Sequence, residues 1–302
     1  MCRRKKGYLC DLIPEKMPAT RTVVRLHLSM HFKVYPHFLL LIISLHFLLA
    51  GCSQPGNMDV EQLSFLRDSL KPTPSTQAHY TPETITGTIY LTFDDGPLYG
   101  SENINRIIEN EKIKVNVFVV GKHAETNKKL KEYYRLYSEN PFVEIGNHSY
   151  THALGKYREF YSNTPGTVRD FEKCQKNLGI PTMIARLPGR NQWRLNSVSK
   201  NDIGSGTSTS DSLQKIGFKI YGWDIEWNKN SSTGGPKQSV EYMVELIERQ
   251  LRDSSTVRPG HIILLAHDEM FKNTGAMELQ KLIGKLKATN KYAFEHLSNY
   301  PG

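Results

Sequence analysis

The chain has 302 residues, of which 38% are apolar and 23% charged. This is the composition of a folded globular protein and excludes a disordered one. The net charge of +9 is uneven, because residues 1–51 carry +6 and the remainder only +3. A basic face for nucleic acid is therefore not predicted, and we expect no nucleic-acid partner.

The N-terminal segment has the pattern of an export signal. Residues 38–50 read FLLLIISLHFLLA, which is too short to span a bilayer but has the length of a signal-peptide core. The run ends in LAGC, which resembles the bacterial lipobox, where the cysteine is lipidated and begins the mature protein. We expect residues 1–51 to be a leader and Cys52 to be the lipidation site. An uncleaved anchor or an ordinary secretory signal is the alternative.

The boundaries of this leader follow from its composition. Met30 is a better start than Met1, because Lys33 then supplies the positive charge that precedes the apolar core. Residues 52–86 are polar and rich in proline, which is typical of a linker. The protein is thus predicted to be an exported, membrane-anchored lipoprotein of the bacterial cell envelope, with one folded domain at 87–302.

Short β-branched and aromatic runs alternate with helical patterns through this domain. Strands are predicted at 88–94, 115–120, 142–148, 182–186, 218–225, 261–267 and 291–297. Helices are predicted at 102–110, 127–138, 167–178, 238–252 and 275–288. The alternation predicts an α/β fold, a distorted (β/α) barrel of about seven parallel strands. An open doubly wound sheet is the competing topology.

Several polar residues stand where predicted strands end. In parallel α/β folds the carboxyl ends of the strands carry the chemistry. The candidate site residues at these positions are Asp94, Asp95, His148, Arg186, Asp224 and His267.

Asp94 and Asp95 open the run DDGP. Adjacent carboxylates in a strand point to opposite faces, but where a strand leads into a Gly-Pro turn they can reach different parts of one site. Asp-Gly is also common in ordinary turns, which is the simpler interpretation of this run taken alone.

Two histidines, His148 and His152, stand four residues apart in HSYTH. One helical turn brings such a pair to about 5–6 Å at Cβ, a spacing that suits two ligands of one divalent ion. An exposed pair of histidines is the alternative. Asp95 would complete a His-His-Asp set, and imidazole with carboxylate favours zinc over magnesium. Three protein ligands leave a position open for water.

Three further runs supply groups for the same site. Arg186 opens RLPGRNQW, and a guanidinium there can orient a carboxylate. Trp227 ends WDIEW, where an aromatic ring either stacks on a sugar or packs in the core. His267 ends LLAH, and a histidine after an apolar strand can be a general acid with its pKa tuned by a carboxylate.

In order, TFDDGP, HSYTH, RLPG, WDIEW and LLAH resemble the motifs of the NodB-type polysaccharide deacetylases, carbohydrate esterase family 4. The resemblance covers about residues 87–290, and the first two motifs are its most specific part. It implies a distorted (β/α) barrel, in agreement with the alternation above. It also implies metal-dependent hydrolysis of the N-acetyl group of an N-acetylglucosamine-containing polysaccharide, with release of acetate.

The resemblance implies a role for each candidate residue. Asp94 would be the general base, held in place by Arg186. The single divalent ion, preferably zinc, would be bound by Asp95, His148 and His152. His267 would be the general acid, with Asp224 as the carboxylate that tunes it.

The third motif departs from the family pattern. An aromatic residue usually follows its proline, and Gly189 stands there instead. We expect this change to open the substrate groove, so that Asn191 and Trp193 could supply contacts, and a backbone N–H near Gly189 would stabilise an oxyanion. The expected substrate-binding residues are Gly189, Trp193 and Trp227.

The fourth motif is one residue shorter than the family's Asp-x-x-Asp-Trp. The carboxylate partner of His267 therefore stays open between Asp224, Glu226 and Asp268.

The expected substrate is peptidoglycan, a chitin-like chain or an exopolysaccharide, and the lipid anchor would add the membrane as a partner. An O-acetyl esterase or another amide hydrolase with the same site is one alternative. A carbohydrate-binding lipoprotein on an inactivated scaffold is another, but the presence of both Asp94 and His267 favours an enzyme.

Overall fold

The computed structural model describes residues 86–302. The predicted leader, the lipidation site Cys52 and most of the linker lie outside the described residues, and these predictions stay untested. Among residues 86–302, no helix is long and apolar enough to cross a bilayer.

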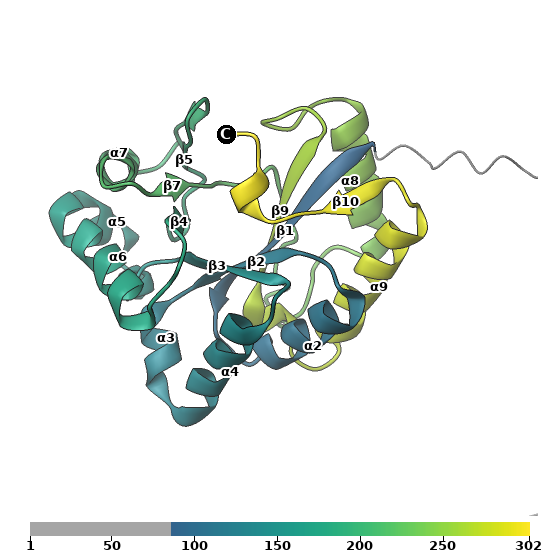
Figure 1. The fold of residues 1–302 in the computed structure, drawn as a ribbon, viewed down its shortest axis with the longest axis horizontal. Coiled ribbons are helices and arrows are strands. Elements are labelled where there is room, and N and C mark those ends of the chain that lie inside the picture. Colours follow the sequence, from purple (N-terminus) through teal and green to yellow (C-terminus); the bar gives the residue numbers. More distant parts are fainter. Residues whose placement is uncertain (1–85) are drawn as a thin grey trace, which may run out of the picture. The chain divides into compact units, whose positions relative to one another are not determined.

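A ten-stranded sheet forms the centre of the described part, and helices lie around its outside (Figure 1). Its parallel strands run in the order β7-β4-β3-β2-β1-β9-β8, with β10 paired to β1. These strands are β1 Gly87–Gly96, β2 Val115–Val119, β3 Val143–Asn147, β4 Ile184–Ala185, β7 Lys219–Ile220, β8 Ile225–Glu226, β9 His261–His267 and β10 Tyr292–Phe294. An antiparallel hairpin, β5 Trp193–Arg194 and β6 Ser199–Lys200, extends the sheet beyond β7. The predicted α/β fold, a distorted (β/α) barrel, is confirmed, with the sheet curled into a half-barrel.

The helices follow the strands in the expected alternation. The longer ones match the predicted ranges within a few residues: α2 Ser101–Glu111, α4 Lys128–Glu139, α6 Thr164–Leu178, α8 Val240–Arg252 and α9 Gly275–Ala288. Three short helices were not predicted: α3 Gly121–Thr126, α5 Tyr157–Ser162 and α7 Thr207–Lys215. These three span too few turns for an apolar period to stand out in the sequence.

The single strand predicted at 218–225 is wrong. The chain forms β7, which pairs with β4, and then crosses the open side of the sheet to β8, which pairs with β9. Between them, the carbonyls of Tyr221 and Gly222 accept hydrogen bonds from the Arg186 guanidinium at 3.1 and 2.8 Å. The buried side chain of Arg186, which follows β4, thus satisfies two backbone carbonyls that a neighbouring strand would otherwise satisfy.

The two faces of β1 explain how the site is positioned. Ile89, Leu91 and Phe93 belong to the main core cluster beneath the outer helices. The alternating residues Tyr90, Thr92 and Asp94 share the opposite face because side chains alternate along a strand. Tyr90 lies in the second core cluster, inside the curl of the sheet. Asp94 therefore ends a face that points into the barrel interior.

A bulge ends β1. The pairing of β1 with β2 shifts between Phe93 and Gly96. Phe93 pairs with Val117 and Gly96 with Val119, so that β1 has one residue more than β2 between these two pairs. Asp95 lies in this bulge with a left-handed φ of 70°. Bulges re-aim side chains and are common beside active sites. Here the bulge turns two successive carboxylates toward one site, which regular alternation would forbid.

Candidate active site

Asp94 forms a buried ion pair with Arg186. Arg186 follows β4 directly, is fully buried, and its Nη1 donates to Asp94 Oδ1 and to Thr92 Oγ1, each at 2.8 Å. Burial lowers the pKa of Arg186, and the Asp94 carboxylate opposes this effect. A buried guanidinium without a partner would cost several kcal/mol. The pair therefore fixes the orientation of the Asp94 carboxylate inside the barrel.

Asp95, His148 and His152 form a compact group of possible metal ligands, with one ligand atom of each lying within 4.8 Å of the others. The Oδ1 atom of Asp95 lies 3.0 Å from His152 Nε2 and 3.5 Å from His148 Nε2. His148 follows β3, and His152 begins a 3₁₀ turn, His152–Gly155. The histidine spacing does not come from an α-helix, because Ser149 and His152 both have left-handed φ angles.

These atoms fit a divalent cation. The ring Nδ1 of His148 lies 2.9 Å from the Arg186 carbonyl, to which it can only donate, so in the neutral ring Nε2 presents a lone pair to the site. Asp95 Oδ1 is buried without a hydrogen-bond partner. Burial alone would raise the pKa of Asp95, but His148 and His152 outweigh it and hold that pKa well below its usual range. An ionised oxygen facing two imidazole nitrogens is a suitable ligand set for a first-row divalent ion.

His267 is the last residue of β9 and lies in register with Asp94 on the neighbouring strand. Both side chains line one cavity of about 270 Å³ together with the three candidate ligands. His267 Nδ1 is buried and has no hydrogen-bond partner among the described residues. The five strand-end residues Asp94, Asp95, His148, Arg186 and His267 are therefore brought together, as the sequence predicted.

Asp224 is placed differently from the prediction. It precedes β8 instead of ending a strand, and its two carboxylate oxygens accept backbone N–H groups of Val257 and Ile263 at 2.7 and 2.8 Å. Its carboxylate thus holds the start of β9 and is absent from the cavity wall. Glu226, which lines the cavity with His267, is the better placed of the open carboxylate candidates.

Asp268, the third candidate, turns away from His267. Its oxygens accept hydrogen bonds from Ser101 Oγ at 2.5 Å, Tyr137 Oη at 2.8 Å and the Gly100 backbone N–H at 3.1 Å. The carboxylate is fully buried and joins the turn after β9 to the start of α2. We assign it to holding these two segments together.

Asp268 should make the stability depend on pH. Burial is the main cause that raises the pKa of Asp268 from 3.8 to about 6, against the hydrogen bonds from Ser101, Tyr137 and Gly100. A raised folded-state pKa gives stability that is present below the unfolded value and lost as the pH rises through the folded one. Relative to Asp268→Asn, the free energy of unfolding of the native chain should fall by about 2 kcal/mol between about pH 4 and pH 7. Denaturant unfolding across this range measures it, and a difference that does not change with pH would contradict it.

Trp193 and Trp227 do not contact the cavity, which corrects the prediction that they bind substrate. Both are fully buried. Trp193 donates from Nε1 to Asn191 Oδ1 at 2.8 Å, and Trp227 donates to the Gln238 carbonyl at 2.9 Å. Their large rings fill core space, which is the commoner use of tryptophan.

The aromatic walls of the cavity are Trp223 and Tyr157. Asn191 holds Trp223 through its backbone, since its side chain accepts from Trp223 N at 3.1 Å and donates to Trp223 O at 2.9 Å. Tyr157 comes from α5 and lies 3.3 Å from where a Cβ of Gly189 would be. Gly189 lines the cavity as predicted, but the ring of Tyr157 fills the space beside it. The groove is therefore not widened.

Sequence reasoning missed Tyr157 and Trp223, and it left Glu226 as one of three open candidates. Tyr157 lies on a helix too short to be recognised, and its place beside Gly189 depends on the path of the chain from residue 152. Trp223 and Glu226 stood within the recognised WDIEW run. No pattern in that run distinguishes the wall residue Trp223 from the core residue Trp227.

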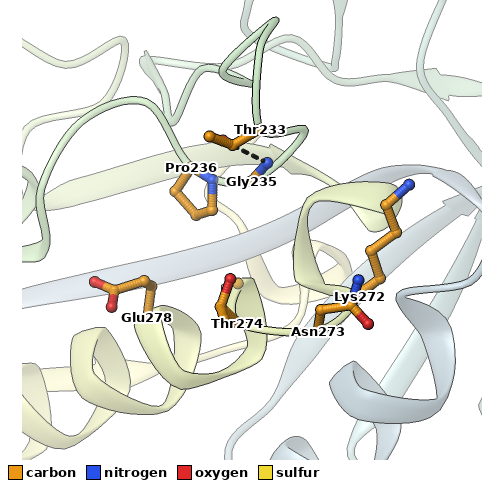
Figure 2. Close-up of a pocket in the computed structure, with 8 residues that line it drawn as sticks. Thr233, Gly235, Pro236, Lys272, Asn273, Thr274 and Glu278 are labelled. Carbon is orange, nitrogen blue, oxygen red and sulfur yellow. Dashed lines mark hydrogen bonds between the residues drawn. The ribbon is translucent and has the colours of Figure 1, made fainter. Parts of the chain in front are cut away.

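A second cavity, of about 230 Å³, lies between the loop at residues 233–236 and the start of α9 (Figure 2). Its walls include Thr233, Lys272, Thr274 and Glu278. It contains no histidine and no pair of acidic residues. The candidate active site is therefore the cavity at the ends of β1, β3 and β9.

The fold and the candidate site together define a class of protein. The domain is a curled parallel α/β sheet whose strand ends carry a candidate divalent-metal site beside a buried aspartate–arginine pair. The family model described as polysaccharide deacetylase matches residues 81–188. This match covers about a third of the chain and agrees with the resemblance of its motifs to the NodB-type polysaccharide deacetylases, carbohydrate esterase family 4.

A curated protein is also similar to the chain. The chitin disaccharide deacetylase of Vibrio alginolyticus is 22% identical over an alignment of 203 residues, with 47% of this chain and 47% of that protein covered. The chain thus spans about half the length of this curated relative.

Solved structures share the fold. A family 4 carbohydrate esterase from Streptomyces lividans has a TM-score of 0.51 at 17% identity, covering 72% of this chain and 95% of its own. A Streptococcus mutans esterase of the same family has a TM-score of 0.51 at 18% identity, covering 70% and 87%.

Proposed function

We propose that the chain hydrolyses the N-acetyl group of a polysaccharide that contains N-acetylglucosamine, releasing acetate and a free amino sugar. The observation that carries the proposal is the cavity that joins Asp94, His267 and the three candidate metal ligands. Amide hydrolysis needs a base for water, an acid for the leaving nitrogen and stabilisation of an oxyanion, and these groups supply all three.

The metal we propose is a single zinc ion held by Asp95, His148 and His152. The two imidazole nitrogens and one carboxylate suit zinc better than magnesium, which prefers oxygen ligands. When bound, such an ion would polarise the acetamide carbonyl and acidify a water molecule.

The residues of this chain then divide the proton transfers between them. Asp94, fixed by Arg186, accepts a proton from the attacking water. His267, beside it on β9, donates a proton to the nitrogen as the C–N bond breaks. We propose Glu226, in the same cavity wall, as the carboxylate that tunes His267. A backbone N–H near Gly189 would add to oxyanion stabilisation.

The sugar-binding faces we propose are the rings of Tyr157 and Trp223. Aromatic rings offer large apolar faces at low conformational cost, which suits the apolar faces of pyranose rings. Both rings line the cavity, and Asn191 holds the backbone of Trp223 from behind.

Acetate release from a panel of polymers tests the proposed activity. Zinc-loaded protein is incubated with peptidoglycan, chitooligosaccharides, a poly-N-acetylglucosamine exopolysaccharide and O-acetylated xylan. We expect release from at least one of the three N-acetylated polymers, with a free amine formed for each acetate. Release from O-acetylated xylan alone would support an esterase instead, and release from none would refute the hydrolase.

We also propose that the protein is exported and anchored to the membrane by a lipid on Cys52. The apolar run at 38–50 and the small residues before Cys52 support this proposal. Mass spectrometry of the mature N-terminus tests it, because an unmodified Cys52 in the exported protein would contradict the lipid anchor.

A further inference from the structure

We propose that His123 is a positioning residue for the metal site, acting through the backbone of Asp95. The proposal rests on the metal-dependent function proposed above and adds a residue to it. His123 does not reach the cavity wall, and no motif includes it.

The bulge at Asp95 creates a need for this contact. Asp95 has no partner in the register of β1 with either β2 or β9. The residue inserted by a bulge leaves the hydrogen-bond ladder, and its carbonyl then needs another donor. Asp95 also keeps a left-handed φ of 70°, which a residue with a Cβ adopts only when its surroundings hold it there.

His123 supplies the missing donor. Its ring Nδ1 lies 2.7 Å from the carbonyl oxygen of Asp95, and a carbonyl can only accept, so this nitrogen carries the proton. The contact is partly buried at the first turn of α3. It fixes the backbone on which the Asp95 carboxylate stands, and hence the direction of that carboxylate toward His148 and His152.

The segment that carries His123 also holds the histidine loop. The backbone N–H groups of Gly121 and Lys122 donate to the carbonyls of Ser149 and Tyr150, at 3.1 and 2.8 Å. Gly121 allows this approach, because a Cβ there would lie 2.5 Å from the Tyr150 ring.

Residues 120–123 therefore link the two loops that bear the candidate ligands. Val120 N donates to the Gly96 carbonyl at 2.7 Å, next to Asp95, while the following amides hold the histidine loop. His123 is the only side chain of this segment with a hydrogen bond to the Asp95 loop among the described residues. Groups that orient ligands in this way typically change metal affinity about 10–100-fold when removed.

Three variants test the role of the ring N–H. His123→Leu removes the donor at similar volume, and His123→Phe removes it while keeping a ring, should the leucine variant fail to fold. His123→Asn restores a donor close to the position of Nδ1. The matched control is His296→Leu, because His296 makes the same kind of bond, from its ring to the Phe142 carbonyl at 3.0 Å, on the C-terminal segment.

Zinc affinity is measured by competition with a chromophoric chelator, and the visible spectrum of bound cobalt reports the ligand geometry. We expect His123→Leu or His123→Phe to weaken zinc binding about 10–100-fold and to alter the cobalt spectrum. His123→Asn should retain most of the affinity, and His296→Leu should match the native chain.

Two outcomes would overturn the inference: native zinc affinity in the leucine and phenylalanine variants, or an equal loss in His296→Leu. Because binding is measured without substrate, its result is separate from the polymer panel. A chain that binds zinc but releases no acetate would refute the proposed activity and leave the role of His123 standing. A native chain that binds no divalent ion would refute both.

Discussion

Asp95→Asn is expected to lose its divalent ion and, with it, acetate release. Asparagine adopts the left-handed backbone of position 95 more readily than alanine does, so the bulge should survive the change. The change replaces a charged ligand by a neutral amide. A tightly held zinc ion contributes roughly 10–16 kcal/mol, so one ligand of three corresponds to a loss of about 10²–10⁴-fold in affinity.

Metal content after dialysis and zinc affinity by chelator competition measure the loss in Asp95→Asn. The control is Asp253→Asn, which makes the same chemical change at an exposed position whose ion pair within residues 86–302 is with Arg252. Stoichiometric zinc in Asp95→Asn at native affinity would refute the ligand assignment. Circular dichroism of both variants shows whether the fold is kept.

Asp94→Asn is expected to have the opposite pattern, with the metal retained and turnover lost. Loss of a general base typically lowers the rate about 10²–10⁴-fold. The Asp94 carboxylate is also the counter-ion of the fully buried Arg186, so the variant should be less stable. Breaking a buried pair costs about 3–5 kcal/mol, although an asparagine oxygen can still accept one hydrogen bond from Arg186.

The steady-state rate of acetate release, taken well below the melting temperature, measures this effect. Zinc affinity measured on the same sample gives the comparison with Asp95→Asn. The two variants differ only in which neighbouring carboxylate becomes an amide. Near-native turnover in Asp94→Asn would exclude Asp94 as the base. Loss of zinc equal to that in Asp95→Asn would mean that the two carboxylates share the metal.

The candidate site could be predicted from sequence where its residues stand at the ends of regular strands. Asp94, His148, Arg186 and His267 each end or directly follow a strand that shows as an apolar run. In a parallel sheet those ends lie on one side, so the order of runs along the chain is enough to bring the side chains together.

The position of Asp224 could not be predicted from the order of apolar runs. The run FKIYGWDI looks like one strand, but it is two short strands separated by a crossing. Arg186 binds the backbone of the crossing, and that contact joins residues 35 or 36 positions apart. A pattern read along the chain cannot include a partner so distant. The residue at the expected strand end therefore holds backbone amides, and Glu226 takes the place in the cavity.

The positions of the tryptophan side chains also depend on contacts that are distant in sequence. Trp193, Trp223 and Trp227 all stand in the recognised runs RLPGRNQW and WDIEW, yet only Trp223 lines the cavity. Whether a large aromatic ring is buried or can contact a ligand depends on which residues pack over it. For Trp193 this cover includes Tyr300, near the far end of the chain.

The sequence by itself determined the α/β class, the strand ends that carry the candidate site residues and the family resemblance, because each depends on local periodicity or on short motifs. Only the tertiary structure decided how two successive aspartates face one site, which carboxylate accompanies His267 and which rings line the cavity. It also placed His123 behind Asp95. These features depend on a bulge, a crossing and a loop contact, each fixed by packing between segments that are distant in sequence.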